Sequence, residues 1–275
     1  MIEQSMLFHI QDYALERDWY VAFGGMSRGN RHLFRVVTIA RFLSQKEQAR
    51  GDICEAGAWL HDSYLALGND DDPQRIRAEA DAYLAGLALD EDSRRRIAEC
   101  VEAHEGVGAA ASLEAKIVHD ADALDKMGLL GVIRHTWKMV NLIAREATAS
   151  DIFFRLQAHL RMREKRLYTA TAKQLVWVIN RELPHFFAHR ERAIAIIDLI
   201  MQRARLALTS DEIATELLCQ TDQWGLLSQL EISQPILEGW YAQSARSASR
   251  DESQLAHASS SASGSVAQSG GMMIP

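Results

Sequence analysis

The segment AGAWLHDSYLALG, residues 56–68, joins an apolar stretch to two side chains that commonly bind metals. Apolar residues run up to Trp59 and Leu60, as in a buried helix, and His61 and Asp62 follow directly. Neighbouring side chains on a helix point about 100° apart, so this pair cannot easily converge on one ion from the middle of a helix. We therefore expect a helix to end here and to hold both side chains at a polar pocket.

The remaining sequence indicates an all-α fold. Only four prolines occur, strand-like alternation is scarce, and Ala, Leu, Arg and Glu recur at helical spacing. Asp52 with Glu55 predicts a capping-box helix start, Asp72 before Pro73 predicts a second start, and Asp90 predicts a third. Further helices are expected at about residues 4–19, 32–49, 112–127, 128–149, 151–165, 170–188, 190–208 and 211–229.

The composition limits the classes of function. The net charge of -7 and a pI near 5.8 argue against a protein whose main task is binding a nucleic-acid backbone. Cys54, Cys100 and Cys219 are widely spaced and odd in number, which favours reduced thiols over a disulfide framework. The N-terminal segment lacks a basic leader, and no apolar run approaches the roughly 20 residues of a membrane span. We expect a cytoplasmic protein without membrane contact.

Three further features accompany the His61-Asp62 pair: His32 in RGNRHLFRV, His104 in EAHEG, and the acidic cluster in KIVHDADALDKMG, residues 116–128. Two imidazoles with two carboxylates suit a borderline or hard divalent ion, namely Mn, Mg, Co, Ni, Fe or Zn. Helical periodicity does not decide which aspartate of the acidic cluster would take part. The other scattered histidines are expected to be ordinary surface or core residues: His9, His135, His159, His185, His189 and His257.

This ordered series resembles the HD superfamily of metal-dependent phosphohydrolases. Four blocks carry the resemblance, which covers roughly residues 28–190: HLFRVVTIARFL, EAGAWLHD, LEAKIVHDADALDKMG and REKRLYTATAKQL. It implies that His32, His61, Asp62 and Asp122 are the metal ligands. The family pattern of Asp followed two residues later by Leu selects Asp122 over Asp120 and Asp125, which are left with supporting or surface roles.

The resemblance also implies roles around the metal. Asp62 and His104 are the expected catalytic residues, and His104 would help bind a second metal, contact phosphate or donate a proton, with a purely structural role as the alternative. By charge and placement, the candidates for substrate phosphate oxygens are Lys116, Arg28, Arg31 and Arg35. Tyr64 stands where many relatives have glycine, and its bulk is expected to narrow the pocket.

The expected function is hydrolysis of a phosphoester or phosphoanhydride by a metal-activated water. By resemblance, the substrate would be a nucleotide or a similar small phosphorylated metabolite. The alternatives are a hydrolase of a signalling nucleotide, such as an alarmone, and a helical interaction module that keeps the fold without the chemistry. Cyclic-dinucleotide hydrolases of the superfamily usually carry a Gly-Tyr-Pro block that this chain lacks.

Three regions are expected along the chain. Residues 1–190 would form the HD-type phosphohydrolase domain. Residues 191–242 read as amphipathic helices, which would pack on that domain or form a contact between copies in a homo-oligomer. From residue 243 the sequence turns to Ser, Ala, Gly and Gln, too polar to offset the entropy of ordering, so 243–275 is expected to be a disordered tail.

Overall fold

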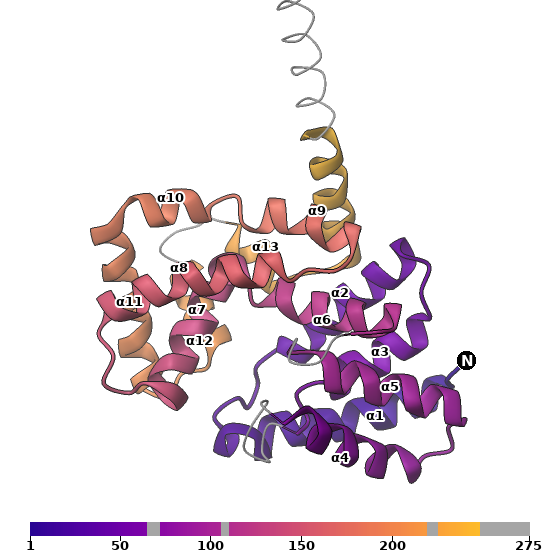
Figure 1. The fold of residues 1–275 in the computed structure, drawn as a ribbon. Helices are drawn as coiled ribbons and strands as arrows, with labels where there is room; N and C mark the ends of the chain where they lie inside the picture. Colours follow the sequence, from indigo (N-terminus) through magenta and orange to yellow (C-terminus); the bar gives the residue numbers. More distant parts are fainter. Residues whose placement is uncertain (65–71, 106–109, 219–224, 248–275) are drawn as a thin grey trace, which may run out of the picture.

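The computed structural model describes residues 1–64, 72–105, 110–218 and 225–247 (Figure 1). Within these ranges the chain forms helices and no β-strand, which confirms the predicted all-α fold. None of the helices in this part of the chain is long and apolar enough to cross a membrane. Most of the predicted tail, residues 248–275, lies outside the described residues, whereas residues 243–247 are the last turn of a helix that spans 234–247.

One group of helices shares a hydrophobic core built mainly from the first half of the chain. Its members are α1 (Gln4–Glu16), α2 (His32–Lys46), α3 (Gly51–Leu60), α4 (Pro73–Ala85), α5 (Glu91–Ala103), α6 (Leu113–Asp125) and α9 (Ala170–Ile179). Helices α2, α3 and α6 pack directly against one another, and α5 covers α3 and α6. Phe42 on α2, Ile53 on α3 and Ile117 on α6 are fully buried between them. These three helices carry the site described below.

A second group has a hydrophobic core of its own and lies beside the first (Figure 1). It contains α7 (Gly128–Lys138), α8 (Ala149–Lys165), α10 (Leu183–Ala188), α11 (Arg190–Arg205), α12 (Ser210–Leu218) and α13 (Leu226–Leu230). Helices α7 and α8 belong to the predicted domain 1–190, yet they share this core with α11 and α12 of the predicted extension. The helix at 234–247 returns to the first group, where Leu237 is fully buried.

Two of the three predicted helix starts are confirmed. Asp72 caps α4 by accepting a hydrogen bond from the Arg75 N–H, and Asp90 caps α5 by accepting one from the Ser93 N–H. The predicted capping box at Asp52 is wrong, because α3 already begins at Gly51 and its cap has no side-chain hydrogen bond. The Asp52 carboxylate instead accepts a hydrogen bond from the Ile2 N–H at 2.8 Å, fixing the start of the chain to α3.

The single helix predicted at 170–188 is two helices, α9 and α10, separated by the turn at 180–182. Pro184 stands in the first turn of α10, where a missing N–H leaves no intrahelical bond unmade, whereas the same residue inside a continuous helix would break one. The helix predicted at 211–229 likewise corresponds to α12 and α13, and the residues between them lie outside the described part of the chain.

Candidate metal centre

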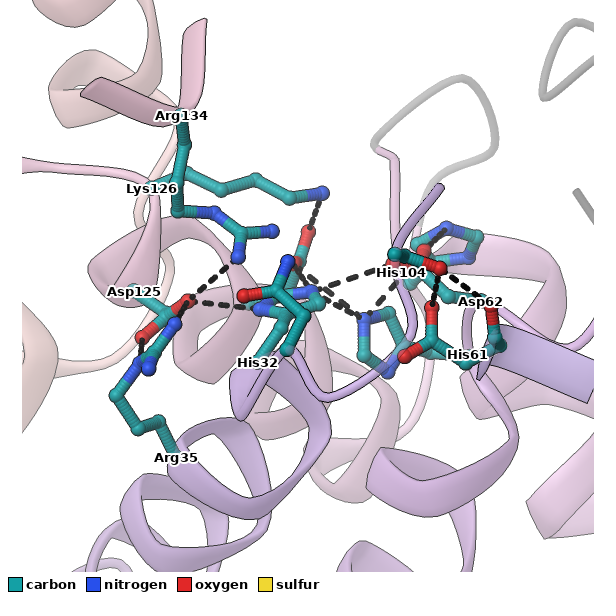
Figure 2. A network of polar contacts seen from close by, with 12 residues as sticks. His32, Arg35, His61, Asp62, His104, Asp125, Lys126 and Arg134 are labelled. Carbon is teal, nitrogen blue, oxygen red and sulfur yellow. Dashed lines mark hydrogen bonds and ion pairs between the residues drawn. The ribbon is translucent and has the colours of Figure 1, made fainter. Parts of the chain in front are cut away.

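The ends of three helices place the His and Asp side chains together (Figure 2). His32 is the first residue of α2, His61 follows the last residue of α3, and Asp122 lies in the last turn of α6. All three are buried, and each offers one ligand atom within 4.8 Å of the others. The helix end that the sequence predicted at His61 is therefore present, and it lets His61 and its neighbour Asp62 face the same space.

The two imidazole rings are oriented by hydrogen bonds at their outer nitrogens. His32 Nδ1 lies 2.7 Å from Asp125 Oδ2, and His61 Nδ1 lies 2.7 Å from the Ala58 carbonyl oxygen, which can only accept. A neutral imidazole that donates through Nδ1 keeps a lone pair on Nε2. The two Nε2 atoms face each other at 3.2 Å, so the protein directs both lone pairs into one small space.

Two carboxylates complete this space. Asp62 Oδ2 lies 3.2 Å and Asp122 Oδ1 lies 3.3 Å from His32 Nε2, and Asp122 Oδ1 lies 3.4 Å from His61 Nε2. An ion with bonds of about 2.1 Å places neighbouring ligand atoms roughly 3.0 Å apart in an octahedron and roughly 3.4 Å apart in a tetrahedron. Asp62 Oδ1 and Asp122 Oδ1 are also buried without a hydrogen-bond partner among the described residues. This set of donors fits a small divalent cation.

Carboxylate oxygens and imidazole nitrogens lie close together in the cluster, and this proximity shifts their pKa values. Burial and the nearby Arg134 lower the pKa of His32, but hydrogen bonds to Asp122, Asp125 and Asp62 outweigh them and raise it to about 9. Burial raises the pKa of Asp62, yet His61 and Lys126 hold it well below its usual range. Without a cation, the cluster therefore retains a proton that a bound metal would displace.

The three aspartates of α6 have different surroundings. Asp122 faces the two imidazoles, as described above. Asp125 contacts His32 from the opposite side of the ring and accepts a hydrogen bond from Arg35 Nε. Asp120 accepts hydrogen bonds from the N–H groups of Tyr168 and Thr169, at 2.9 and 2.7 Å, and so joins α6 to the segment before α9. Of the three, only Asp122 is oriented toward both histidines.

His104 follows the last residue of α5 and lies on the other side of Asp62 from His32. Its Nδ1 contacts the Val101 carbonyl oxygen at 2.6 Å, and its Nε2 lies 3.5 Å from Asp62 Oδ1. Burial lowers the pKa of His104, but Asp62, Glu105 and Asp122 outweigh burial and raise it to about 9. The structure thus brings the predicted catalytic pair Asp62 and His104 together.

A cavity opens in front of the cluster and extends toward the second group of helices. Asp18, Asp62 and Glu105 contribute carboxylates to its wall. Positive charges come from Lys126 at the end of α6, from Arg134 and Lys138 on α7, and from Arg163 on α8. Phe23 and Trp137 add aromatic surface, and His135 and His159 complete the wall. The cavity therefore combines residues of the candidate metal centre with several cations.

The four cations predicted to bind substrate do not line this cavity. Arg35 is buried and divides its guanidinium between Asp125 and Asp211. Arg28 and Arg31 line a separate surface depression, and Lys116 is two turns of α6 before the cavity-facing end. Positive charge close to His32 in the sequence does not determine the direction in which a side chain points, so substrate binding by these four residues stays a prediction. The cavity-lining cations instead come from residues 126–163.

Tyr64 also differs from its expected place. It is buried in the first hydrophobic core and does not line the cavity, so its bulk does not narrow the candidate pocket.

The sequence patterns did not identify several residues that line the cavity. Lys126 donates from Nζ to Asp122 Oδ2 at 2.7 Å and to Glu105 Oε1 at 3.0 Å, and its i,i+4 spacing from Asp122 was a usable signal. His135 and His159, expected to be ordinary, stack with ring centroids 4.1 Å apart in the cavity wall. Asp18 lies 14 residues before His32 in a segment without a motif, and only the fold brings it to the cavity.

Together, the fold and this cluster define an all-α protein with a buried His/Asp site suited to a divalent metal. Residues 30–127 match the family model of the HD domain, so the chain contains an HD domain and the resemblance seen in its sequence is confirmed over these residues. No curated protein matches the chain.

Solved structures with the same fold come from two bacteria. YpgQ from Bacillus subtilis is 21% identical with a TM-score of 0.55, and the alignment covers 72% of this chain and 100% of that one. A protein from Lactobacillus plantarum is 24% identical with a TM-score of 0.54, over 70% of this chain and 98% of that one. A structure of Bacillus subtilis YpgQ in complex with ADP is 19% identical with a TM-score of 0.52, over 70% and 99%. At these identities the likeness concerns the fold.

Proposed function

We propose that this protein is a metal-dependent phosphohydrolase that cleaves a phosphoester or phosphoanhydride bond of a nucleotide or a similar small phosphorylated metabolite. The observation that carries the proposal is the convergence of His32, His61, Asp62 and Asp122 beside a cavity that His32 and Asp62 line together with several cations. The HD domain at residues 30–127 supports the same class of activity.

The proposed ligands are His32 Nε2, His61 Nε2, Asp62 and Asp122. A divalent ion held there would lower the pKa of a bound water and neutralise charge on phosphoryl oxygens. Asp125 and the Ala58 carbonyl fix the two rings, so the ligand atoms need little reorganisation. The choice among Mn, Mg, Co, Ni, Fe and Zn follows from the measurement below.

The cations that line the cavity would allow an anionic substrate to bind beside the carboxylates. Carboxylates alone would repel phosphate, but Arg134 and Arg163 from α7 and α8 line the same cavity. Arg134 Nη1 lies 3.6 Å from Asp125 Oδ2, but neither Nη1 nor Nε has a hydrogen-bond partner among the described residues, so this buried guanidinium retains donors for phosphoryl oxygens. The ADP bound in the YpgQ complex supports a nucleotide as the phosphorylated compound.

The test is release of phosphate and pyrophosphate from nucleoside mono-, di- and triphosphates by metal-stripped protein, with each of the six metals returned singly. Asp62→Asn should lose turnover, whereas Asp198→Asn, an exposed aspartate on α11, should not. The bond that is cut follows from which product is released. Tight metal binding without turnover of any phosphorylated compound would contradict the proposed chemistry, and absence of metal binding would instead favour a helical interaction module.

A further inference from the structure

Asp18 is a buried carboxylate that no part of the proposed metal site uses. It lies in the short segment Arg17–Val21 that follows α1, is 4% exposed, and lines the cavity with His32 and Asp62. This segment precedes the residues matched by the HD-domain family model, 30–127.

The two oxygens of the Asp18 carboxylate differ in their contacts. Ser27 Oγ donates to the Asp18 main-chain carbonyl oxygen and lies 3.4 Å from Asp18 Oδ1. Asp18 Oδ2 is buried and has no hydrogen-bond partner among the described residues. A buried acceptor without a partner is costly, so its position in a cavity indicates a partner that enters with the ligand or with water.

Of the carboxylates in the cavity wall, Asp18 is the one left to accept a proton. The wall contains Asp18, Asp62 and Glu105 within the described residues. Asp62 belongs to the proposed ligand set. Glu105 accepts from Lys126 Nζ at 3.0 Å and lies 3.9 Å from Arg163 Nη2, and its pKa is held well below the usual range, mainly by Lys126. A carboxylate stabilised by two cations is a weak base.

We propose that Asp18 Oδ2 accepts the proton of the attacking water in the hydrolysis, a role that rests on the proposed function. One O–H bond of the water breaks as its proton moves to Oδ2, and the water oxygen forms a bond to phosphorus. The P–O bond to the leaving group breaks, its electron pair stays on the leaving oxygen, and that oxygen takes a proton from solvent or from the Asp18 carboxyl group. Ser27 lies beside Oδ1, which leaves Oδ2 as the carboxylate oxygen without a partner among the described residues.

The charges around Asp18 suit this role. Burial raises its pKa to about 6, with a further upward contribution from Asp62, while His32, Arg134 and His61 oppose them. A carboxylate with a pKa near the working pH is ionised at neutrality and remains a useful proton acceptor. The carboxylates of the ligand cluster, whose pKa values are lowered, hold protons far less readily.

The test compares Asp18→Asn with Asp12→Asn, an exposed aspartate on α1, as the matched control. Loss of a general base typically lowers the rate by about 10²–10⁴-fold, so kcat of Asp18→Asn should fall within this range with little change in KM. The rise of wild-type activity with pH near 6 should disappear. Mn²⁺ affinity, measured by calorimetry, should equal that of the wild type, because Asp18 is not a proposed ligand.

A second variant guards against a folding defect. Asp18→Ala should recover part of its kcat when formate is added, because a small carboxylate can enter the vacated space, and Asp12→Ala should not respond. Full activity of Asp18→Asn, or a loss of its Mn²⁺ affinity, would overturn the role of Asp18 alone. A wild-type protein without turnover would overturn the proposed function and this role with it.

Discussion

His32 and Asp125 form a hydrogen bond of 2.7 Å that connects a proposed metal ligand to the interface between the two groups of helices. Asp125 also accepts from Arg35 Nε, and Arg35 Nη1 donates to Asp211 Oδ2 on α12 at 2.8 Å. The orientation of His32 therefore depends on a chain of buried charges that reaches α12. Arg35, expected from the sequence to contact substrate, holds this chain together through Asp125 and Asp211.

Asp125→Asn should weaken metal binding. An amide cannot accept from both His32 Nδ1 and Arg35, because one of its two heavy atoms is a donor. Loss of such a hydrogen bond behind a metal-binding histidine typically lowers metal affinity about 10- to 100-fold. Calorimetric titration with Mn²⁺ measures this change directly. The variant should also unfold at a lower temperature, because Arg35 loses a buried partner.

Asp120→Asn is the matched control on the same helix. Asp120 is buried and bonds only to the segment before α9, so its substitution should lower the unfolding temperature without changing Mn²⁺ affinity. Equal losses of metal affinity in Asp120→Asn and Asp125→Asn would mean that the effect comes from stability and not from the orientation of His32.

Arg163→Gln should weaken substrate binding. Arg163 lines the cavity from α8, and its Nε donates to His159 Nε2 at 2.8 Å, which directs the guanidinium toward Glu105 and the cavity. A hydrogen bond to a charged group contributes about 1.5–3 kcal/mol, so KM for a nucleotide substrate should rise about 10- to 100-fold. The same change should be seen in the affinity for inorganic pyrophosphate, measured by calorimetry.

Arg161→Gln serves as the control for that experiment. Arg161 is exposed on the same helix and lines a different groove beside Trp177. The KM should stay at the wild-type value in this variant. If both arginine variants raise KM equally, the cause is a general loss of positive charge and not a contact in the cavity.

Gly57→Ala should destabilise the protein. An added Cβ at Gly57 on α3 would lie 2.5 Å from Cys100 Cβ on α5, so the two helices would have to separate. Overpacking of this kind costs about 1–3 kcal/mol of unfolding free energy. Gly239→Ala, in the helix at 234–247, meets nothing within 4 Å and should instead stabilise by about 0.5–1 kcal/mol. Urea denaturation compares the two variants.

The sequence predicted the fold class from local helical patterns, and the resemblance to the HD superfamily predicted the histidine-aspartate cluster. Helical periodicity covers most of the chain, and the ends of helices α2, α3 and α6 can be located from residues near His32, His61 and Asp122. The cavity wall could not be predicted in this way. Apart from Lys126, its cations lie on α7 and α8, and only the packing of two separate hydrophobic cores brings them to the cavity beside the cluster.

The case of Asp18 illustrates the same limit. Nothing in the sequence around it distinguishes it from Asp12, which lies six residues earlier and is exposed. Asp18 lies where the helix changes its hydrogen-bonding pattern, at Arg17–Val21, and it is buried beside Ser27. Conversely, the charges of Arg28 and Arg31 suggested a phosphate site, although both are exposed and face a different depression.

The stacked pair of His135 and His159 should make stability depend on pH. Burial, helped by the nearby Arg163, lowers the pKa of His135 to about 4 and that of His159 to about 3. The unfolded chain, with pKa values near 6.5, therefore binds more protons than the folded protein between pH 6.5 and 4. Their contribution to stability is complete above pH 6.5 and is lost as the pH falls toward 4.

Thermal unfolding measured from pH 7 to pH 4 tests this linkage. The unfolding temperature of the wild type should fall over this range, and the fall should be less steep when both histidines are replaced by glutamine, because glutamine does not titrate. His9→Gln, on the exposed face of α1, should keep the wild-type slope. If the double variant keeps that slope too, the two rings take up protons equally in the folded protein and in the unfolded chain, and their burial does not shift their pKa values.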